Sequence, residues 1–67
     1  MRTFKKSLKS LDRYEFDKTS YIDIEGGCYS ETIVDDGSGF AEPGGWYDIE
    51  DEKQFIDGLL NAGYEEL

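Results

Sequence analysis

The segment at residues 46–63 reads WYDIEDEKQFIDGLLNAG, and it combines a helix start signal, a helical period and a stop signal. Its apolar residues fall at i, i+1, i+4 and i+5, so they share one stripe of an α-helix. They are Phe55, Ile56, Leu59 and Leu60. Asp48 or Asp51 can cap the first turn, and Gly63 can adopt the left-handed conformation that ends many helices. We expect the remaining apolar residues to pack against this helix.

The acidic residues at the start of this helix should stabilise it, whereas the glycine in its interior should destabilise it. Its start is strongly acidic, and each well-placed carboxylate near the positive end of the helix dipole stabilises the helix by about 0.3–1 kcal/mol. The acids concerned are Asp48, Glu50, Asp51 and Glu52. Gly58 costs about 1 kcal/mol relative to alanine in a helix interior. Either another part of the chain packs close to Gly58 or the helix is marginal.

Upstream of the helix, polar and apolar residues alternate in short runs, a pattern typical of half-buried strands. We expect one strand at residues 13–17, with Tyr14 and Phe16 on one face, and another at residues 21–25. In the second strand Ile22 and Ile24 share a face. Residues 18–20 are the candidate turn between these two strands.

The pair Gly26-Gly27 is a stronger turn signal, because both residues can adopt the positive φ of a two-residue hairpin loop. It leads into a strand at residues 28–34, whose inward face the pattern leaves ambiguous. Loops are expected at residues 35–39 and 42–45, which are rich in Asp, Gly, Ser and Pro. Residues 40 and 41 are candidates for an edge strand. Trp46 and Tyr47 are expected to form a last short strand, with Trp46 as a core or interface anchor.

At the N-terminus, Phe4, Leu8 and Leu11 recur at i, i+4 and i+7 with lysines between them. This spacing predicts a short amphipathic basic helix, although part of the segment could also form a strand. The sequence therefore predicts an α+β fold with residues 1–67 as a single domain. Its sheet would be small and antiparallel, with three or four strands, packed by the C-terminal helix.

The composition favours a folded but highly charged chain. Among 67 residues there are 16 acids against 7 bases, a formal charge of −9, which raises the question of disorder. Ten aromatic residues and a single proline favour folding instead. Residues 1–18 carry a balance of +3 and residues 19–67 a balance of −12. We expect the two ends of the chain to prefer different partners.

Several classes of function are disfavoured. Histidine, the commonest general base and metal ligand, is absent, and Cys28 is the only cysteine. The acids at residues 35–42 lack the spacing of a calcium loop, so Asp35 and Asp36 are read as a solvated acidic turn. We expect a non-enzymatic protein without cofactor or metal. No segment has the apolar length of a signal peptide or membrane span, which predicts a soluble, cytoplasmic protein.

The acidic surface with aromatic residues beside it is the candidate partner-binding site. Carboxylates at phosphate-like spacing can occupy a surface built for the DNA backbone. The alternative is that these charges serve only solubility. The candidate site residues are Asp35, Asp36, Trp46, Tyr47, Asp48, Glu50, Asp51 and Glu52.

The run Gly-Trp-Tyr-Asp at residues 45–48, followed by acids and by two apolar pairs, resembles a pattern in ArdA-type antirestriction proteins. That pattern is Gly-x-Trp-x-Asp followed by an acidic helix; here tryptophan follows Gly45 directly, and Gly44 precedes it by two positions. Proteins of that family mimic DNA and block restriction enzymes, and this chain would correspond to at most one of their several domains. In size, acidity and lack of histidine, the chain is also similar to small phage-encoded inhibitors of host enzymes and CRISPR nucleases.

We therefore expect an acidic protein, encoded by a phage or mobile element, that inhibits or regulates a host protein with a basic nucleic-acid-binding surface. Nucleic acid itself and membranes are not expected as partners. The alternative is a small structural or regulatory subunit, or a homodimer, that uses an apolar interface. Binding through the acidic surface should weaken steeply with salt, whereas an apolar interface should respond little.

Overall fold

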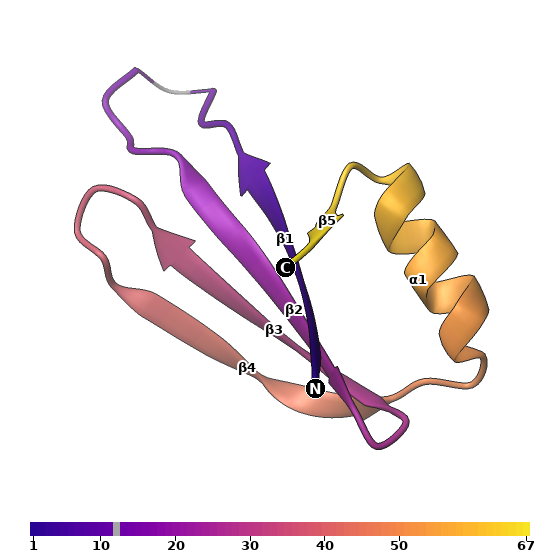
Figure 1. The fold of residues 1–67 in the computed structure, drawn as a ribbon. Coiled ribbons are helices and arrows are strands. Elements are labelled where there is room, and N and C mark those ends of the chain that lie inside the picture. Colours follow the sequence, from indigo (N-terminus) through magenta and orange to yellow (C-terminus); the bar gives the residue numbers. More distant parts are fainter. Residues whose placement is uncertain (12) are drawn as a thin grey trace.

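A computed structural model describes residues 1–11 and 13–67, which form a five-stranded antiparallel sheet and one helix (Figure 1). Asp12 lies outside the described residues. The elements in chain order are β1 (Arg2–Leu8), β2 (Lys18–Glu25), β3 (Cys28–Asp35), β4 (Ala41–Asp48), α1 (Glu52–Asn61) and β5 (Glu65–Glu66). The strand order is β4-β3-β2-β1-β5, so β4 and the two-residue β5 are the edges.

The predicted fold class is wrong. The described chain is mostly β, with five strands rather than three or four, and the helix is followed by β5 instead of ending the fold. The expected N-terminal helix is strand β1. Phe4 and Leu8 are four residues apart, a spacing that places them on one face of a strand as well as of a helix. Lys6 lies on that same face, with its ammonium 5.8 Å from the centre of the Tyr64 ring.

The hairpin of β2 and β3 forms where the glycine pair predicts it. Gly26 and Gly27 have φ values of 58° and 76°, and the strands pair from Glu25 opposite Cys28. Ile22 and Ile24 are buried on one face of β2, as expected. The turn predicted at residues 18–20 is wrong, because these residues begin β2.

The strand predicted at residues 13–17 is also wrong. Since Leu8 pairs with Lys18, residues 9–17 are the connection between β1 and β2, and its described part contains no strand. Tyr14 and Phe16 are 80% and 65% exposed instead of half-buried. Phe16 lies across Gly37 of the β3–β4 loop, so that a Cβ added at Gly37 would collide with the Phe16 ring. Figure 1 shows these two loops together at the end of the sheet far from the Gly26-Gly27 turn.

Strand β4 covers the stretch at residues 42–45 that was predicted to be a loop, so that prediction is wrong as well. The strand accommodates Pro43 because it is an edge strand, where a residue without an N–H can face away from the sheet. Its pairing with β3 shifts register between Ser30 and Thr32, an irregularity opposite its two glycines. The loop predicted at residues 35–39 is confirmed for residues 36–39, whereas Asp35 is the last residue of β3.

Helix α1 lies within the segment that the sequence marks as helical, and both of its ends have the expected chemistry. The Asp51 carboxylate accepts the N–H of Gln54 at 3.1 Å, which identifies Asp51 as the N-cap. At the other end Gly63 has φ of 97°, and the N–H of Tyr64 reaches the carbonyl of Leu59 at 2.9 Å. These features form a Schellman motif, in which the left-handed conformation of Gly63 ends α1.

The core is small and lies between α1 and one face of the sheet. Its buried apolar residues are Phe4, Ile22, Ile24 and Ile56. Partly buried residues complete it: Tyr29, Ile49, Phe55, Leu59 and Tyr64. Leu60 is half-exposed, so only part of the apolar stripe of α1 is covered. Within the described residues, no helix is long and apolar enough to cross a membrane.

Candidate functional site at the junction of strand β4 and helix α1

The candidate site residues fall into two groups at opposite ends of β4. Asp35 is the last residue of β3, and Asp36 begins the turn before β4. The other six lie at the end of β4, in the connection to α1 or at the first residue of α1. An eight-residue strand is about 26 Å long at the usual rise per residue, so the two groups cannot form one compact site. The structure places six of the candidates close together along the backbone, although not all on one face: Trp46, Tyr47, Asp48, Glu50, Asp51 and Glu52.

The two turn carboxylates serve the fold. Asp35 accepts the N–H groups of Gly37 at 2.9 Å and Ser38 at 3.0 Å. These hydrogen bonds, that of Ser38 first, hold the pKa of Asp35 below its usual value. Asp36 accepts the hydroxyl of Thr19 at 2.8 Å, which ties the turn to β2. Throughout the described residues, no group of three or more acidic or thiol side chains is placed to hold a metal ion.

The acids at the β4–α1 junction differ in their local roles. Asp51 caps the helix, and Glu52 begins it. Asp48 accepts a hydrogen bond from the thiol of Cys28 across the β3–β4 pair, with 3.4 Å between Sγ and Oδ1. That hydrogen bond, together with partial burial and the carboxylate charge, raises the pKa of Cys28 and so favours the neutral thiol. Among these acids, Glu50 and Glu52 can be neutralised without removing the helix cap or the contact to Cys28.

A shallow hollow of about 370 Å³ lies at this junction. Its lining residues are Tyr29, Asp48, Ile49, Glu50, Asp51, Gln54 and Phe55. The Tyr29 ring lies 4.7 Å from the Phe55 ring and 5.6 Å from the Tyr47 ring, measured between centroids. In the described structure none of the lining residues is basic. The hollow therefore combines an aromatic floor with a carboxylate rim, an arrangement suited to a cationic group.

Trp46 and Tyr47 point to opposite faces of the sheet, because successive strand residues alternate. Tyr47 pairs with Tyr29 on the side of α1, whereas Trp46 pairs with Ser30 on the open face. They are 54% and 58% exposed, so the prediction of Trp46 as a core anchor is wrong and an interface role stays a prediction. Sequence reasoning missed Tyr29 and Phe55 as parts of the site. The helical spacing places Phe55 on the core stripe, and the pattern of the strand that contains Tyr29 leaves its inward face ambiguous.

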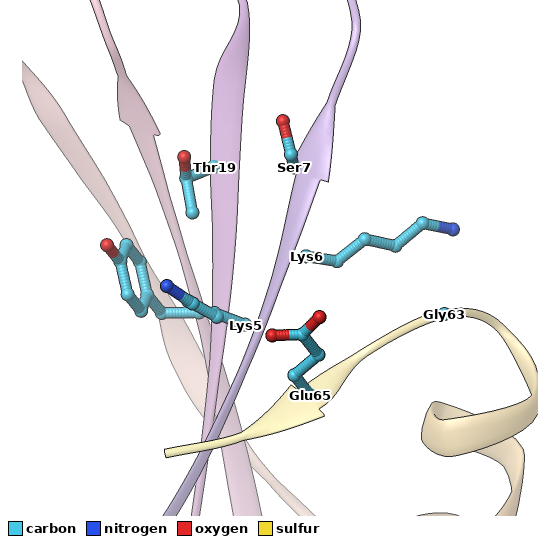
Figure 2. Close-up of a pocket in the computed structure, with 7 residues that line it drawn as sticks. Lys5, Lys6, Ser7, Thr19, Gly63 and Glu65 are labelled. Carbon is cyan, nitrogen blue, oxygen red and sulfur yellow. The ribbon is translucent and has the colours of Figure 1, made fainter.

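A second hollow of about 220 Å³ lies at the opposite edge of the sheet, where β5 stops pairing with β1 (Figure 2). It is lined by Lys5, Lys6, Ser7, Thr19, Tyr21, Gly63 and Glu65. Figure 2 shows the two lysine side chains diverging to opposite sides of β1, with the Glu65 carboxylate near the strand between them. Because the ammonium groups do not converge, this hollow is a poorer candidate site than the junction.

The difference in charge between residues 1–18 and residues 19–67 becomes a difference between the two edges of the sheet. Arg2, Lys5 and Lys6 lie on β1, which is separated from β4 by β2 and β3. The Arg2 guanidinium binds Glu66 of β5 through two hydrogen bonds of 2.8 and 2.7 Å. Lys5 and Lys6 therefore lie away from the acidic junction, whereas Arg2 lines a hollow together with Glu52 and Lys53 and partly compensates the charge of Glu52. The hollow that Asp48, Glu50 and Asp51 line has no described basic residue.

Comparison of the chain with protein-family models, curated proteins and solved structures finds no match. The resemblance to ArdA-type proteins accordingly stays a prediction.

Proposed function

We propose that this chain is a non-enzymatic binding protein that docks its acidic β4–α1 junction on the basic, nucleic-acid-binding surface of a host protein. Docking there would block or regulate the host protein by occupying the place of the nucleic acid. The observation that carries the proposal is the clustering of Asp48, Glu50, Asp51 and Glu52 within five consecutive residues. The first three of these acids line an aromatic hollow whose described lining includes no base.

Electrostatics supplies the physical reason for this choice of partner. Nucleic-acid affinity depends largely on the neutralisation of phosphates by Lys and Arg, so a surface that binds phosphates also attracts suitably spaced carboxylates. Self-repulsion among uncompensated acids destabilises a compact chain, which favours a use for the charge beyond solubility. Trp46 and Tyr47, both exposed beside the acids, belong to the residue types that dominate interface energetics.

The shape of the molecule is compatible with this mode of binding. Its extents are 39 × 22 × 17 Å, an elongated body with a cross-section similar to that of a nucleic-acid duplex. As an inhibitor of the phage or mobile-element type, the chain would act in the host cytoplasm and would need neither cofactor nor metal. DNA mimicry of the ArdA or anti-CRISPR kind is the form of inhibition that the resemblance suggests.

The test is an affinity capture from bacterial lysate at low salt, followed by a salt step and identification of the released proteins. We expect a nuclease, polymerase or other nucleic-acid enzyme that is released by salt and competed by DNA. With the target in hand, the double variant Glu50→Gln, Glu52→Gln should bind about tenfold more weakly or worse, because it loses two interfacial charges but keeps the Asp51 cap.

The matched control is Glu15→Gln, Glu65→Gln, which removes the same charge from the β1–β2 loop and from β5. It should bind nearly as the unchanged chain does. Equal weakening by both double variants would indicate a dependence on net charge alone, and no weakening by either would contradict the proposed site.

A second candidate function is assembly through apolar surface, favoured by the exposed side chains at the far end of the sheet. Leu11, Tyr14, Phe16 and Phe40 are all exposed there. A partner or second copy bound through these residues would resist the salt step, because apolar contacts are not screened. Capture of a salt-resistant partner that is indifferent to the Glu50 and Glu52 changes would favour this alternative.

A further inference from the structure

We infer that the free edge of β4 binds an extended segment of the partner protein as an added strand, and that this segment carries Lys or Arg. The inference rests on the proposed function and specifies how the partner is recognised. Strand β4 pairs on one side with β3, and across the described chain no strand pairs with its other side. All eight of its residues are exposed, and Figure 1 shows β4 as the outermost strand.

The hydrogen bonds of the β3–β4 turn establish which backbone groups of β3 face β4. The N–H of Asp35 donates to the carbonyl of Phe40 at 2.9 Å, so the backbone of Asp35 faces the β4 side. In an antiparallel ladder this direction alternates from residue to residue. Tyr29, six residues earlier, therefore also directs its N–H and C=O towards β4.

The pairing then assigns the groups that β4 directs outward. Tyr29 lies opposite Tyr47, so the backbone of Tyr47 faces β3. By alternation, the N–H and C=O of Trp46 and Asp48 face away from the sheet. The N–H of Ile49 follows the same alternation, since it donates inward to the carbonyl of Gly27 at 2.8 Å. Trp46 and Asp48 thus present the unpaired row of donors and acceptors that strand addition uses.

Only the second half of β4 can pair with an added strand. In the first half Pro43 has no N–H, and the register shift opposite Ser30 and Thr32 bends the strand. These features protect edges against unwanted pairing. An edge left with two outward residues provides few backbone bonds, so binding there needs side-chain contacts as well.

Charge complementarity determines the chemistry of the occupant. The edge ends at the acidic hollow, whose lining includes the acids Glu50 and Asp51 and the rings of Tyr29 and Phe55. A Lys or Arg side chain from an added strand can lay its stem on these rings and direct its charge to the carboxylates. A second copy of the chain would instead bring the same acids against one another. The geometry therefore favours a basic extended segment as the occupant.

Three synthetic peptides test the inference with the intact chain. The first is acetyl-Val-Arg-Val-Arg-Val-Arg-Val-amide, a basic strand former. The second has the same sequence with N-methyl groups on the alternate residues that would donate to β4, which keeps the charge and abolishes pairing. The third has Thr in place of Arg, which keeps the strand preference and removes the charge. Affinity is measured by calorimetry at low salt, and amide exchange by NMR.

We expect the first peptide to bind and the N-methylated peptide to bind about tenfold more weakly or worse. Exchange of the Trp46 and Asp48 amides should slow by about tenfold or more on binding, while that of Tyr47, already bonded to β3, should change little. Equal binding of the first two peptides would overturn strand addition and leave charge attraction as the mode of contact. Absence of binding by all three would overturn the inference as well.

The third peptide separates this inference from the proposed function. If the Thr peptide binds as tightly as the Arg peptide and protects the same amides, pairing occurs but the preference for a basic partner fails. If the Trp46 and Asp48 amides of the chain alone become protected as its concentration rises, the occupant of the edge is a second copy, and the inference is wrong.

Discussion

Asp51 illustrates how one residue can serve both the fold and the candidate surface. Its carboxylate caps α1 through the N–H of Gln54, and its charge lies on the rim of the acidic hollow. Substitutions at Asp51 therefore change stability and binding together unless the cap is preserved. A substitution at Asp48 would likewise remove its hydrogen bond with Cys28 together with its charge.

A matched pair of substitutions separates the two contributions of Asp51. Asp51→Ala should lower the free energy of unfolding by about 1 kcal/mol, because the Gln54 N–H loses its acceptor. Asp51→Asn retains an acceptor oxygen and should cost much less, while both variants lose the same charge from the hollow. Urea unfolding at constant salt measures the difference. Equal destabilisation by the two would mean that charge at the helix start, rather than the hydrogen bond, provides the stabilisation.

At the scale of elements, Gly58 is an unoptimised position in α1. A Cβ built on Gly58 has no described atom within 4 Å, so no close packing explains the glycine. Of the two alternatives that the sequence leaves open, the marginal helix is the one that the structure supports.

Gly58→Ala should therefore raise the free energy of unfolding by roughly 0.5–1 kcal/mol, the usual gain for this change in a helix. The control is Gly63→Ala, which should destabilise because Gly63 has φ of 97°. Thermal or urea unfolding of both variants provides the measurement. Destabilisation by Gly58→Ala would show that α1 packs more closely there than the structure indicates.

The elements that the sequence predicts correctly are those bounded by clear turn or capping residues. The Gly26-Gly27 turn defines the hairpin of β2 and β3, and Asp51 and Gly63 define α1. In β1 no such signals exist, and Lys6 on the inward face obscures the alternation of the strand. Its aliphatic stem tolerates that position because the ammonium reaches the Tyr64 ring, a contact provided by a residue far away in the chain.

The errors at residues 13–17 and in β4 have a common physical origin. Local alternation and local turn composition are weak signals, and the pairing of neighbouring strands overrides them. Leu8 pairs with Lys18, which turns the alternating run at 13–17 into a connection. Pairing with β3 draws Pro43 and its neighbouring glycines into an edge strand. The candidate site was predicted in part: its acids lie within five consecutive residues, but its aromatic floor includes Tyr29 from another strand.

For the whole molecule, acid pH should remove a specific contribution to stability. The hydrogen bond from Arg2, followed by the charge of Arg2, holds the pKa of Glu66 below its ordinary value of 4.5. A carboxyl whose pKa is lower in the folded chain stabilises the fold above its unfolded pKa, and that contribution disappears as the pH falls through the folded value. The pair is partly exposed, so solvent screens it and the effect is small.

Glu66→Gln should lower the free energy of unfolding at pH 7, and the deficit relative to the unchanged chain should shrink as the pH falls below 4.5. Urea unfolding of both proteins at a series of pH values measures this difference in free energy. Acid relieves charge repulsion in both proteins alike, so that effect cancels in the difference. Glu65→Gln, which removes the same charge one residue earlier, is the control and should give a smaller deficit. A Glu66→Gln deficit that does not change with pH would contradict an ionic role for this pair.

The strand order β4-β3-β2-β1-β5 also has a consequence for the speed and sequence of folding. Apart from β5, every strand pairs with its neighbour along the chain, so these contacts need only short loops to close. A nucleus at the Gly26-Gly27 hairpin can grow outward by adding β1 and β4 in either order. Joining β5 to β1 must close nearly the whole chain for two residue pairs and the Arg2–Glu66 contact. That step should come late and contribute little to the folding barrier.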